Sequence, residues 1–231
     1  NCFSYHFTPG AFLMEGGARK LGCAVFPGGV GQTEQQVQAM VNLRPDGYVG
    51  TPSFLKLIID KADELGADIS SLRKALVSGE ALPGVTRTCL AERGIAVRQC
   101  YATADIGAIA YESEIDAGMV VEEDLLLEIV RPGTGDPVPA GEVGEVVVTT
   151  FNRDYPLIRF ATGDLSALLP GMSACGRTNQ RLKGWLGRAD QTTKIKGMFV
   201  HPEQVAEIQA RFPEISRMRL VVDNPQAQDR M

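Results

Sequence analysis

Two short polar segments each follow an apolar run, and both carry groups that suit a nucleotide. The first is Ser78-Gly79-Glu80, and the second is Tyr101-Ala102-Thr103-Ala104-Asp105. Tyr101 offers an aromatic face for a base, Thr103 a hydroxyl for a phosphate, and Asp105 a hard oxygen ligand for Mg²⁺. The first segment taken alone is more typical of a tight turn. The second fits a core tyrosine followed by a helix-capping aspartate equally well.

Two later segments add a carboxylate and a cation. Asp164 in Thr162-Gly163-Asp164 could accept hydrogen bonds from both hydroxyls of a ribose, although an ordinary Gly-Asp turn has the same pattern. Arg188 in Gly187-Arg188-Ala189-Asp190 suits phosphate or ribose oxygens, because its guanidinium presents a fork of donors. Asp190 stands at a polar junction that could absorb the dihedral change of a hinge, and Lys194 follows on a short predicted strand. The alternative for this stretch is a solvated linker.

The cysteines and histidines do not favour a zinc, redox or hydrolase site. The five cysteines form no C-x-x-C pair, and the two histidines, His6 and His201, are far apart in sequence. This pattern argues against a zinc or redox site and against a Ser/His/Asp triad. The glycine-rich stretch at residues 27–33 lacks the dinucleotide fingerprint and the G-x-x-x-x-G-K-[ST] phosphate loop, so we predict a substrate-side or structural loop there.

Composition narrows the class of protein and its partners. Of 231 residues, 44% are hydrophobic and 22% charged, which is typical of a globular protein and excludes wholesale disorder. A net charge of −5 without a basic block predicts no nucleic-acid partner. The apolar runs fall far short of the ~20 residues that cross a bilayer. We therefore expect no membrane partner and, with reduced thiols, a cytoplasmic location; a homodimer is one possibility for the oligomeric state.

The elements that position these groups read first as alternating strands and helices. The predicted strands are residues 23–26, 47–49, 74–77 and 95–101, and the predicted helices begin at Thr33, Pro52 and Pro83. Thr33 is expected to cap its helix, with Gln36 as the capping-box partner. The helix from Pro52 repeats its apolar residues at helical spacing and stops before Gly66. This order predicts an α/β fold with a parallel sheet flanked by helices.

After about residue 120 the pattern changes to paired strands. Runs at 125–130 and 142–150 flank a Pro- and Gly-rich connection, which predicts an antiparallel β subdomain. Further on we predict a strand at 194–197, a helix opening at Pro202 and a closing strand at 219–222. The expected division is 1–120, 121–187 and 188–231.

The four polar segments, taken in their order, resemble those of the adenylate-forming (acyl-CoA synthetase) superfamily, and most of all the phenylacetate-CoA ligase family. The opening stretch at 1–33, with Pro27-Gly28-Gly29, resembles that branch in particular. The likeness implies an ATP-dependent acid–CoA ligase. ATP and a small aromatic or acyl carboxylate would form an acyl-adenylate with help from Mg²⁺, and the thiolate of coenzyme A would then displace AMP.

The resemblance also implies a role for each residue. Nucleotide contacts would come from both halves of the chain: Ser78, Gly79, Glu80, Tyr101, Ala102, Thr103, Asp164 and Arg188. Tyr101 would stack on adenine, Thr103 would contact the adenylate phosphate, and Asp164 would hold the ribose hydroxyls beside Arg188. Their convergence on one AMP-sized cleft is the central expectation.

The remaining roles concern metal, hinge and lid. Asp105 would replace the family's metal-binding glutamate, Asp190 would be the hinge of a small C-terminal lid, and Lys194 would act in the thioester-forming step. The three parts of the chain would thus be a partial α/β adenylate-binding subdomain, an antiparallel β subdomain, and a hinge with the start of a small α+β lid.

Departures from the family pattern keep a second hypothesis open. The family's phosphate loop and its C-terminal lysine are absent, so the isolated chain is expected to lack full turnover. Asp105 is one methylene shorter than glutamate, and Cys175 stands alone where relatives often carry a cysteine pair. The alternative is a non-catalytic adenine-nucleotide-binding module derived from such an enzyme.

Overall fold

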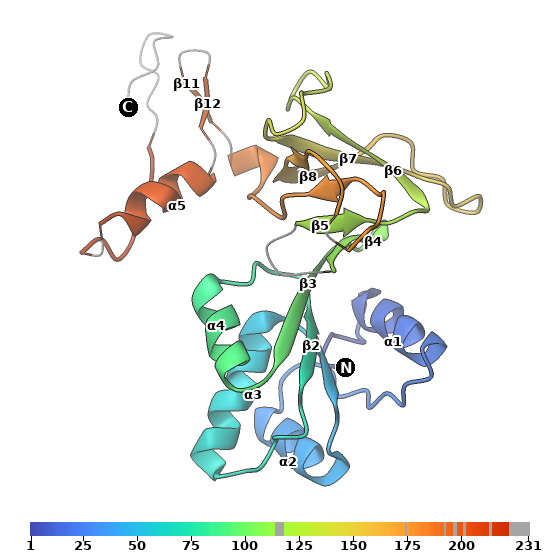
Figure 1. Ribbon diagram of the computed structural model, residues 1–231, viewed down its shortest axis with the longest axis vertical. Coiled ribbons are helices and arrows are strands. Elements are labelled where there is room, and N and C mark those ends of the chain that lie inside the picture. Colours follow the sequence, from blue (N-terminus) through green and yellow to red (C-terminus); the bar gives the residue numbers. More distant parts are fainter. Residues whose placement is uncertain are drawn as a thin grey trace. The chain divides into compact units, whose positions relative to one another are not determined.

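The computed structural model describes residues 1–113, 118–173, 175–191, 193–195, 198–200, 202–212 and 214–221. The chain forms two compact units, and each is built from two stretches of sequence (Figure 1). Unit 1 comprises Asn1–Glu122 and Ser173–Arg177, and unit 2 comprises Glu123–Met172 and Thr178–Met231.

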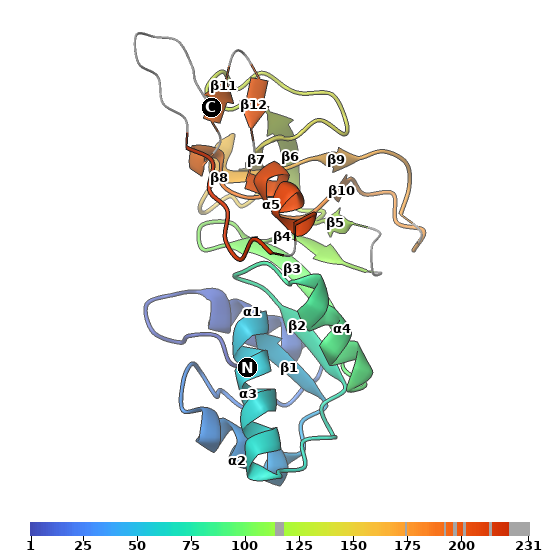
Figure 2. The same cartoon turned by 90° about the vertical axis from the view of Figure 1, so that its left-hand side faces the viewer.

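Unit 1 is built around three parallel strands. These are β1 (Gly47–Gly50), β2 (Lys74–Val77) and β3 (Ala96–Thr103); β1 pairs with β2, and β2 with β3. The helices are α1 (Gly10–Lys20), α2 (Thr33–Leu43), α3 (Pro52–Leu65) and α4 (Gly84–Glu92). Figures 1 and 2 show α3 and α4 on one side of the strands and α1 on the other. The predicted parallel sheet flanked by helices is therefore confirmed.

Helix α3 shows why these residues fold as predicted. The Thr51 hydroxyl accepts a hydrogen bond from the Phe54 N–H at 3.3 Å, which caps the first turn. Gly66 ends the helix with a φ of 60°, a left-handed conformation that glycine adopts at little cost. The apolar stripe between these ends is buried in the core of unit 1: Leu55, Ile58, Ile59 and Ala62.

Two further strands continue the sheet of unit 1 beyond β3. β4 (Gly107–Glu112) pairs antiparallel with β3, and β5 (Met119–Val121) pairs antiparallel with β4. The β3–β4 register shifts between Tyr101 and Ala102. The sequence analysis did not predict β4 or β5, and the helix that it allowed after Asp105 is absent because the chain turns directly into β4.

Unit 2 contains an antiparallel sheet, as predicted, and this sheet has three strands. Its strands are β6 (Leu125–Val130), β7 (Gly144–Thr150) and β8 (Phe160–Ser166), with β7 between the other two. Gly144 is required for close packing here, because a Cβ at this position would overlap the Val130 carbonyl oxygen. A short pair, β9 (Leu168–Leu169) with β10 (Arg181–Leu182), follows.

The last described part of unit 2 consists of four short elements. They are the 3-10 turn η1 (Ala189–Gln191), the antiparallel pair β11 (Thr193–Ile195) and β12 (Met198–Val200), and α5 (Pro202–Ala210). The helix predicted from Pro202 is therefore present. Residues 219–221 form no strand, which corrects that prediction, and Val222 lies outside the described residues.

Two predictions near the N-terminus are wrong. Residues 23–26 form no strand, because an apolar run becomes a strand only where a neighbouring strand pairs with it, and no ladder joins these residues in the described structure. The capping box at Thr33 is absent, since Thr33 is already helical and the residue before it, Gln32, makes no side-chain cap. The Gln36 amide instead donates to the carbonyls of Gly28 and Gly29 at 2.8 and 3.2 Å.

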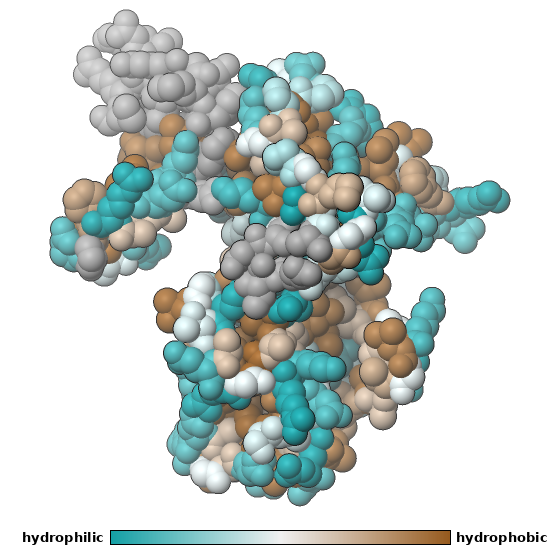
Figure 3. Space-filling view, viewed as in Figure 1, coloured by the Kyte–Doolittle hydropathy of each residue, from teal (hydrophilic) through white to brown (hydrophobic). Residues whose placement is uncertain are grey.

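The surface carries both polar and apolar residues, and the face in Figure 3 shows the two kinds intermixed. The longest of the described helices, α3, has 14 residues. None of the helices in the described part of the chain combines the length and apolar character needed to cross a membrane.

Candidate functional site

A carboxylate held by two donors lies at the centre of the candidate site in unit 2. The Asp164 Oδ1 atom accepts a hydrogen bond from the Trp185 indole N–H at 2.9 Å and another from an Arg188 guanidinium nitrogen at 3.2 Å. The Asp164 side chain is only 13% exposed, whereas that of Arg188 is 42% exposed. The structure therefore brings together Asp164 and Arg188, two residues that the sequence analysis selected from distant segments.

Backbone pairing sets this geometry. Asp164 lies within β8 and forms an isolated antiparallel bridge with Arg188. On the next residue, the Leu165 N–H donates to the Gly187 carbonyl at 2.8 Å, and the Leu186 N–H donates to the Leu165 carbonyl at 2.9 Å. Because these bonds fix the segment beside β8, the donors at 185 and 188 both reach the same carboxylate.

Gly163 allows Arg188 to cross the strand. Its φ is 73°, and a Cβ placed there would lie 2.6 Å from a terminal nitrogen of Arg188. The same guanidinium donates to the Thr162 carbonyl at 3.1 Å, and its Nε lies 3.7 Å from an Asp190 carboxylate oxygen. The Thr162-Gly163-Asp164 segment is thus part of a strand with a left-handed residue, which corrects the interpretation of a simple turn at the end of the run.

Trp185 is the member of this cluster that sequence reasoning missed. It is the chain's single tryptophan, and it lies beside Leu186 in the short stretch between Gly184 and Gly187. Its side chain is 42% exposed, although its N–H points to Asp164. The signal in the sequence that could have identified it was a single large aromatic residue between two glycines.

The Ser78-Gly79-Glu80 segment lies at the carboxyl end of β2 in unit 1. This is the edge of a parallel sheet where ligands collect. Ser78 is 5% exposed, and its N–H donates to the Gly50 carbonyl at 3.1 Å. Gly79 has a φ of 85°, and the Glu80 carboxylate accepts a hydrogen bond from the Ser53 hydroxyl. The chain therefore bends at Gly79 and Glu80, and contact of this segment with a nucleotide stays a prediction.

The Tyr101-to-Asp105 segment ends the neighbouring strand, β3. Tyr101 is buried, with 9% of its surface exposed, and Ala102 is partly buried. Thr103 is the last residue of β3, and its hydroxyl accepts a hydrogen bond from the Ile106 N–H at 3.2 Å, which closes the turn into β4. Asp105 is exposed in that turn. Stacking on adenine would require a face of the Tyr101 ring to be accessible, and this role stays a prediction.

The two residues assigned to the hinge and lid lie in the last part of unit 2. Asp190 belongs to η1, and its side chain is 73% exposed. Lys194 is in β11, where its backbone pairs opposite Phe199 in β12. Lys196 and Gly197 lie outside the described residues. Because the nucleotide-binding candidates belong to two units, their convergence on one cleft also stays a prediction.

The donor set bears on Mg²⁺. No group of three or more His, Cys, Asp or Glu side chains in the described ranges could hold a metal ion. Asp105 can supply one carboxylate, and Mg²⁺ commonly takes one or two carboxylates together with substrate phosphates and water. Asp105 therefore fits a metal that arrives with a nucleotide.

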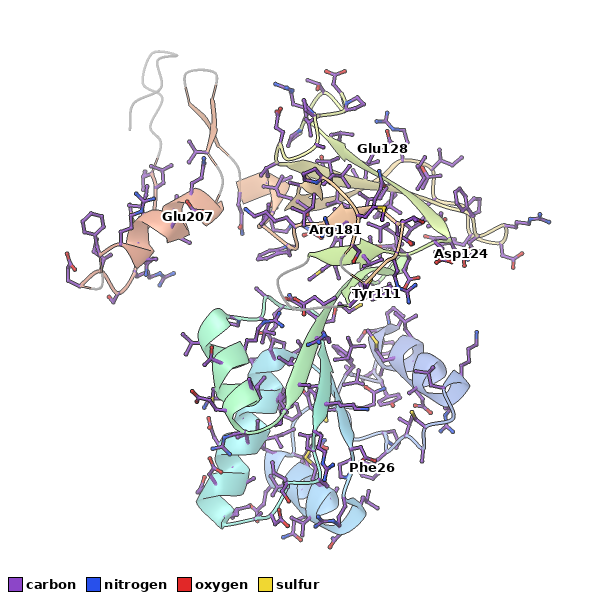
Figure 4. All side chains as sticks on the ribbon, viewed as in Figure 1. Phe26, Tyr111, Asp124, Glu128, Arg181 and Glu207 are labelled. Carbon is purple, nitrogen blue, oxygen red and sulfur yellow. The ribbon has the colours of Figure 1, made fainter. Side chains whose placement is uncertain are left out.

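Cys175 has the most perturbed exposed thiol. Nearby polar groups, the Ser113 and Ser173 hydroxyls and the Arg177 backbone N–H, favour the thiolate and lower the pKa of Cys175 to about 7. The Ser173 oxygen lies 3.0 Å from the sulfur. The Arg177 guanidinium carbon lies 5.8 Å from the centre of the Tyr111 ring, which Figure 4 labels. All five cysteines are free thiols.

Comparison with known proteins identifies the family. Residues 2–152 match the family model described as AMP-binding enzyme. The chain belongs to this family. Its order of segments agrees with the resemblance to adenylate-forming enzymes found in the sequence, and the fold that carries them is the expected mixture of parallel and antiparallel sheet.

Curated relatives point to one branch. The chain is 34% identical over 223 residues to the phenylacetate-coenzyme A ligase of Escherichia coli K12, and 32% identical over 223 residues to that of Thermus thermophilus. Each alignment covers 93% of this chain and 50% of the relative. The chain thus spans about half the length of the curated relatives it matches.

The fold is similar to that of a solved structure. An open conformation of 2-hydroxyisobutyryl-CoA ligase, in complex with 2-HIB-AMP and CoA, superposes with a TM-score of 0.82 at 28% sequence identity. The match covers 93% of this chain and 53% of that one. The chain therefore shares its fold with about half of that CoA ligase.

Proposed function

We propose that this chain is part of an ATP-dependent acid–CoA ligase that forms an acyl-adenylate and then a CoA thioester. The observation that carries the proposal is the Asp164 carboxylate, which Trp185 and Arg188 hold by its Oδ1 atom in a chain of the AMP-binding family. A fixed carboxylate beside a cation suits the hydroxyls of a ribose. The similarity to phenylacetate-coenzyme A ligases over 93% of the chain supports a small aromatic or acyl carboxylate as the substrate.

The residues divide the work as the resemblance implies. Asp164 binds the ribose beside Arg188, Tyr101 stacks on adenine, and Thr103 contacts the phosphate. Further contacts with the nucleotide come from Ser78, Gly79, Glu80 and Ala102. Asp105 holds Mg²⁺ together with the phosphates of ATP. Asp190 serves as the hinge and Lys194 acts in thioester formation.

The chemistry follows from the leaving group. A carboxylate does not expel oxide, whereas an acyl-adenylate expels AMP readily, so the first half-reaction makes the second possible. Because charge develops on the transferring phosphoryl group, fixed donors and the metal lower the barrier by electrostatic stabilisation.

Carboxylate-dependent pyrophosphate exchange on the full-length protein tests the proposal. We expect exchange with phenylacetate or a related acid, and a strong loss of exchange in the Asp164→Ala variant. The Asp136→Ala variant, which removes an aspartate from the loop between β6 and β7, is the matched control. Absence of exchange with every acid tried would refute the ligase; if AMP still bound, the nucleotide-binding module would be the better description.

A further inference from the structure

We propose that Trp185 is a positioning residue of the nucleotide site: its indole N–H fixes the Asp164 carboxylate in the orientation that receives the ribose hydroxyls. The inference rests on the proposed function, and it assigns a role to a residue that the resemblance does not cover. It also makes Trp185 an optical reporter of the site, because the chain contains one tryptophan.

The two donors to Asp164 differ in kind. Arg188 divides its guanidinium among three oxygens: Asp164 Oδ1 at 3.2 Å, the Thr162 carbonyl at 3.1 Å, and Asp190 Oδ1 at 3.7 Å. Trp185 has a single N–H, which it gives to Asp164 at 2.9 Å. The shorter, undivided bond from Trp185 therefore constrains the orientation of the carboxylate more closely than the bond from Arg188 does.

Neutrality makes tryptophan suited to this role. The indole N–H donates without carrying charge and does not titrate, so it orients the carboxylate while leaving its negative charge in place. An ionised carboxylate has about four lone-pair sites, so it can accept from a hydroxyl while it also accepts from an indole N–H. A second cation in place of Trp185 would compete with the ribose for that charge.

The position of Trp185 does not depend on a flexible loop. Flanking residues join β8 through the Leu165–Gly187 and Leu186–Leu165 backbone hydrogen bonds at 2.8 and 2.9 Å. The Ser166 hydroxyl donates to the Gly184 carbonyl at 2.7 Å, on the other side of the indole-bearing residue. Since the backbone is held on both sides, the loss of the indole N–H would remove one constraint on the carboxylate and leave the segment in place.

The test compares AMP binding by the 231-residue chain and its Trp185→Phe variant by calorimetry. Phenylalanine keeps an aromatic ring and removes only the donor. We expect AMP to bind about 3- to 10-fold more weakly to the variant, less than a fully buried charge-assisted bond would give because the ring is partly exposed. With 2′,3′-dideoxy-AMP, which lacks both hydroxyls, the two proteins should bind equally.

The control variant is Tyr155→Phe, which changes an exposed ring of the same unit that is 57% accessible. It should bind AMP as the parent chain does. In the parent chain, AMP should shift the Trp185 emission to shorter wavelength as it excludes water from the ring. The parent's far-UV circular dichroism should be retained by both variants.

The outcomes separate the two claims. If the parent chain does not bind AMP, the proposed nucleotide site is refuted and this inference with it. Equal AMP binding by the parent and Trp185→Phe would overturn the positioning role alone. A loss of the same size for AMP and for the dideoxy nucleotide would also overturn it, because the effect would then not pass through the ribose hydroxyls.

Discussion

Replacing Gly163 by alanine should destabilise unit 2 through two separable effects. The first is backbone strain, because Gly163 has a φ of 73°, where an L-residue costs about 1–2 kcal/mol. The second is displacement of Arg188, since the new Cβ would lie 2.6 Å from its terminal nitrogen and 2.9 Å from its Cζ. A flexible side chain can move away, and the cost is then the loss of its bonds rather than a clash.

The size of the second effect follows from exposure. The displaced guanidinium would lose its 3.2 Å bond to Asp164 and its 3.1 Å bond to Thr162. Arg188 is 42% exposed, so water replaces part of what is lost, and about 1 kcal/mol is expected for the pair. In total, Gly163→Ala should lower the free energy of unfolding by about 2–3 kcal/mol.

Urea denaturation followed by tryptophan fluorescence measures this change, because the single tryptophan lies in unit 2. Gly171→Ala is the matched control. Gly171 has a φ of 77°, and a Cβ there would meet no described atom within 4 Å, so this variant carries the strain without the displacement. The Arg188→Ala background gives a second comparison, since the new Cβ then has room.

The comparison of the two glycine variants tests the contribution of Arg188. Gly163→Ala should cost about 1 kcal/mol more than Gly171→Ala, and the difference should vanish in the Arg188→Ala background. Equal losses in the two glycine variants would show that Arg188 does not depend on the missing Cβ. A difference that persists without Arg188 would assign the cost to the strand itself.

Three further predictions concern other parts of the chain. Gly144→Ala should lower the free energy of unfolding, measured by urea denaturation, by about 3 kcal/mol. The new Cβ would overlap the backbone oxygen of Val130, which cannot rotate away. A loss below about 1 kcal/mol would contradict this. Thr51→Ala should cost about 1 kcal/mol by circular dichroism, since the α3 cap is lost, whereas Thr51→Ser should keep it; equal losses would count against the cap. Iodoacetamide should alkylate Cys175 at a rate that rises through pH ~7, because hydrogen bonding lowers its pKa to about 7 and only the thiolate reacts. Burial raises the pKa of Cys100 to about 11 and protects it. Mass spectrometry measures both rates, and equal rates would contradict the prediction.

The elements that the sequence predicted best are those whose start, end and apolar spacing are all encoded in neighbouring residues. The helix Pro52–Leu65 has its cap, its apolar spacing and its terminal glycine in the sequence, and the structure has the same bounds. Strand Lys74–Val77 is likewise as predicted. Helix α1 escaped notice because its 11 residues include three glycines, which are poor helix formers. A strand at 23–26 was wrong because its apolar run has no ladder there.

The candidate site was predictable in part. The sequence suggested Asp164 and Arg188 as a carboxylate and a cation for a ribose. In the structure, an Arg188 guanidinium nitrogen lies 3.2 Å from Asp164 Oδ1. Nothing in the spacing of 24 residues indicates that contact, because it depends on the backbone bridge between two segments. The bond from Trp185 depends on the same bridge, so the residue that completes the cluster becomes visible only in three dimensions.

The interleaving of the two units limits how such a chain can be recombined. Ser173–Arg177 belongs to unit 1, although the stretches on both sides of it belong to unit 2. A single crossover after Glu122 with a homologous gene would therefore replace the Arg177 that lies over Tyr111 while leaving Tyr111 itself unchanged. Chimeras that exchange unit 2 therefore need two additional junctions, one on each side of Ser173–Arg177, so that this stretch stays with the unit to which it belongs.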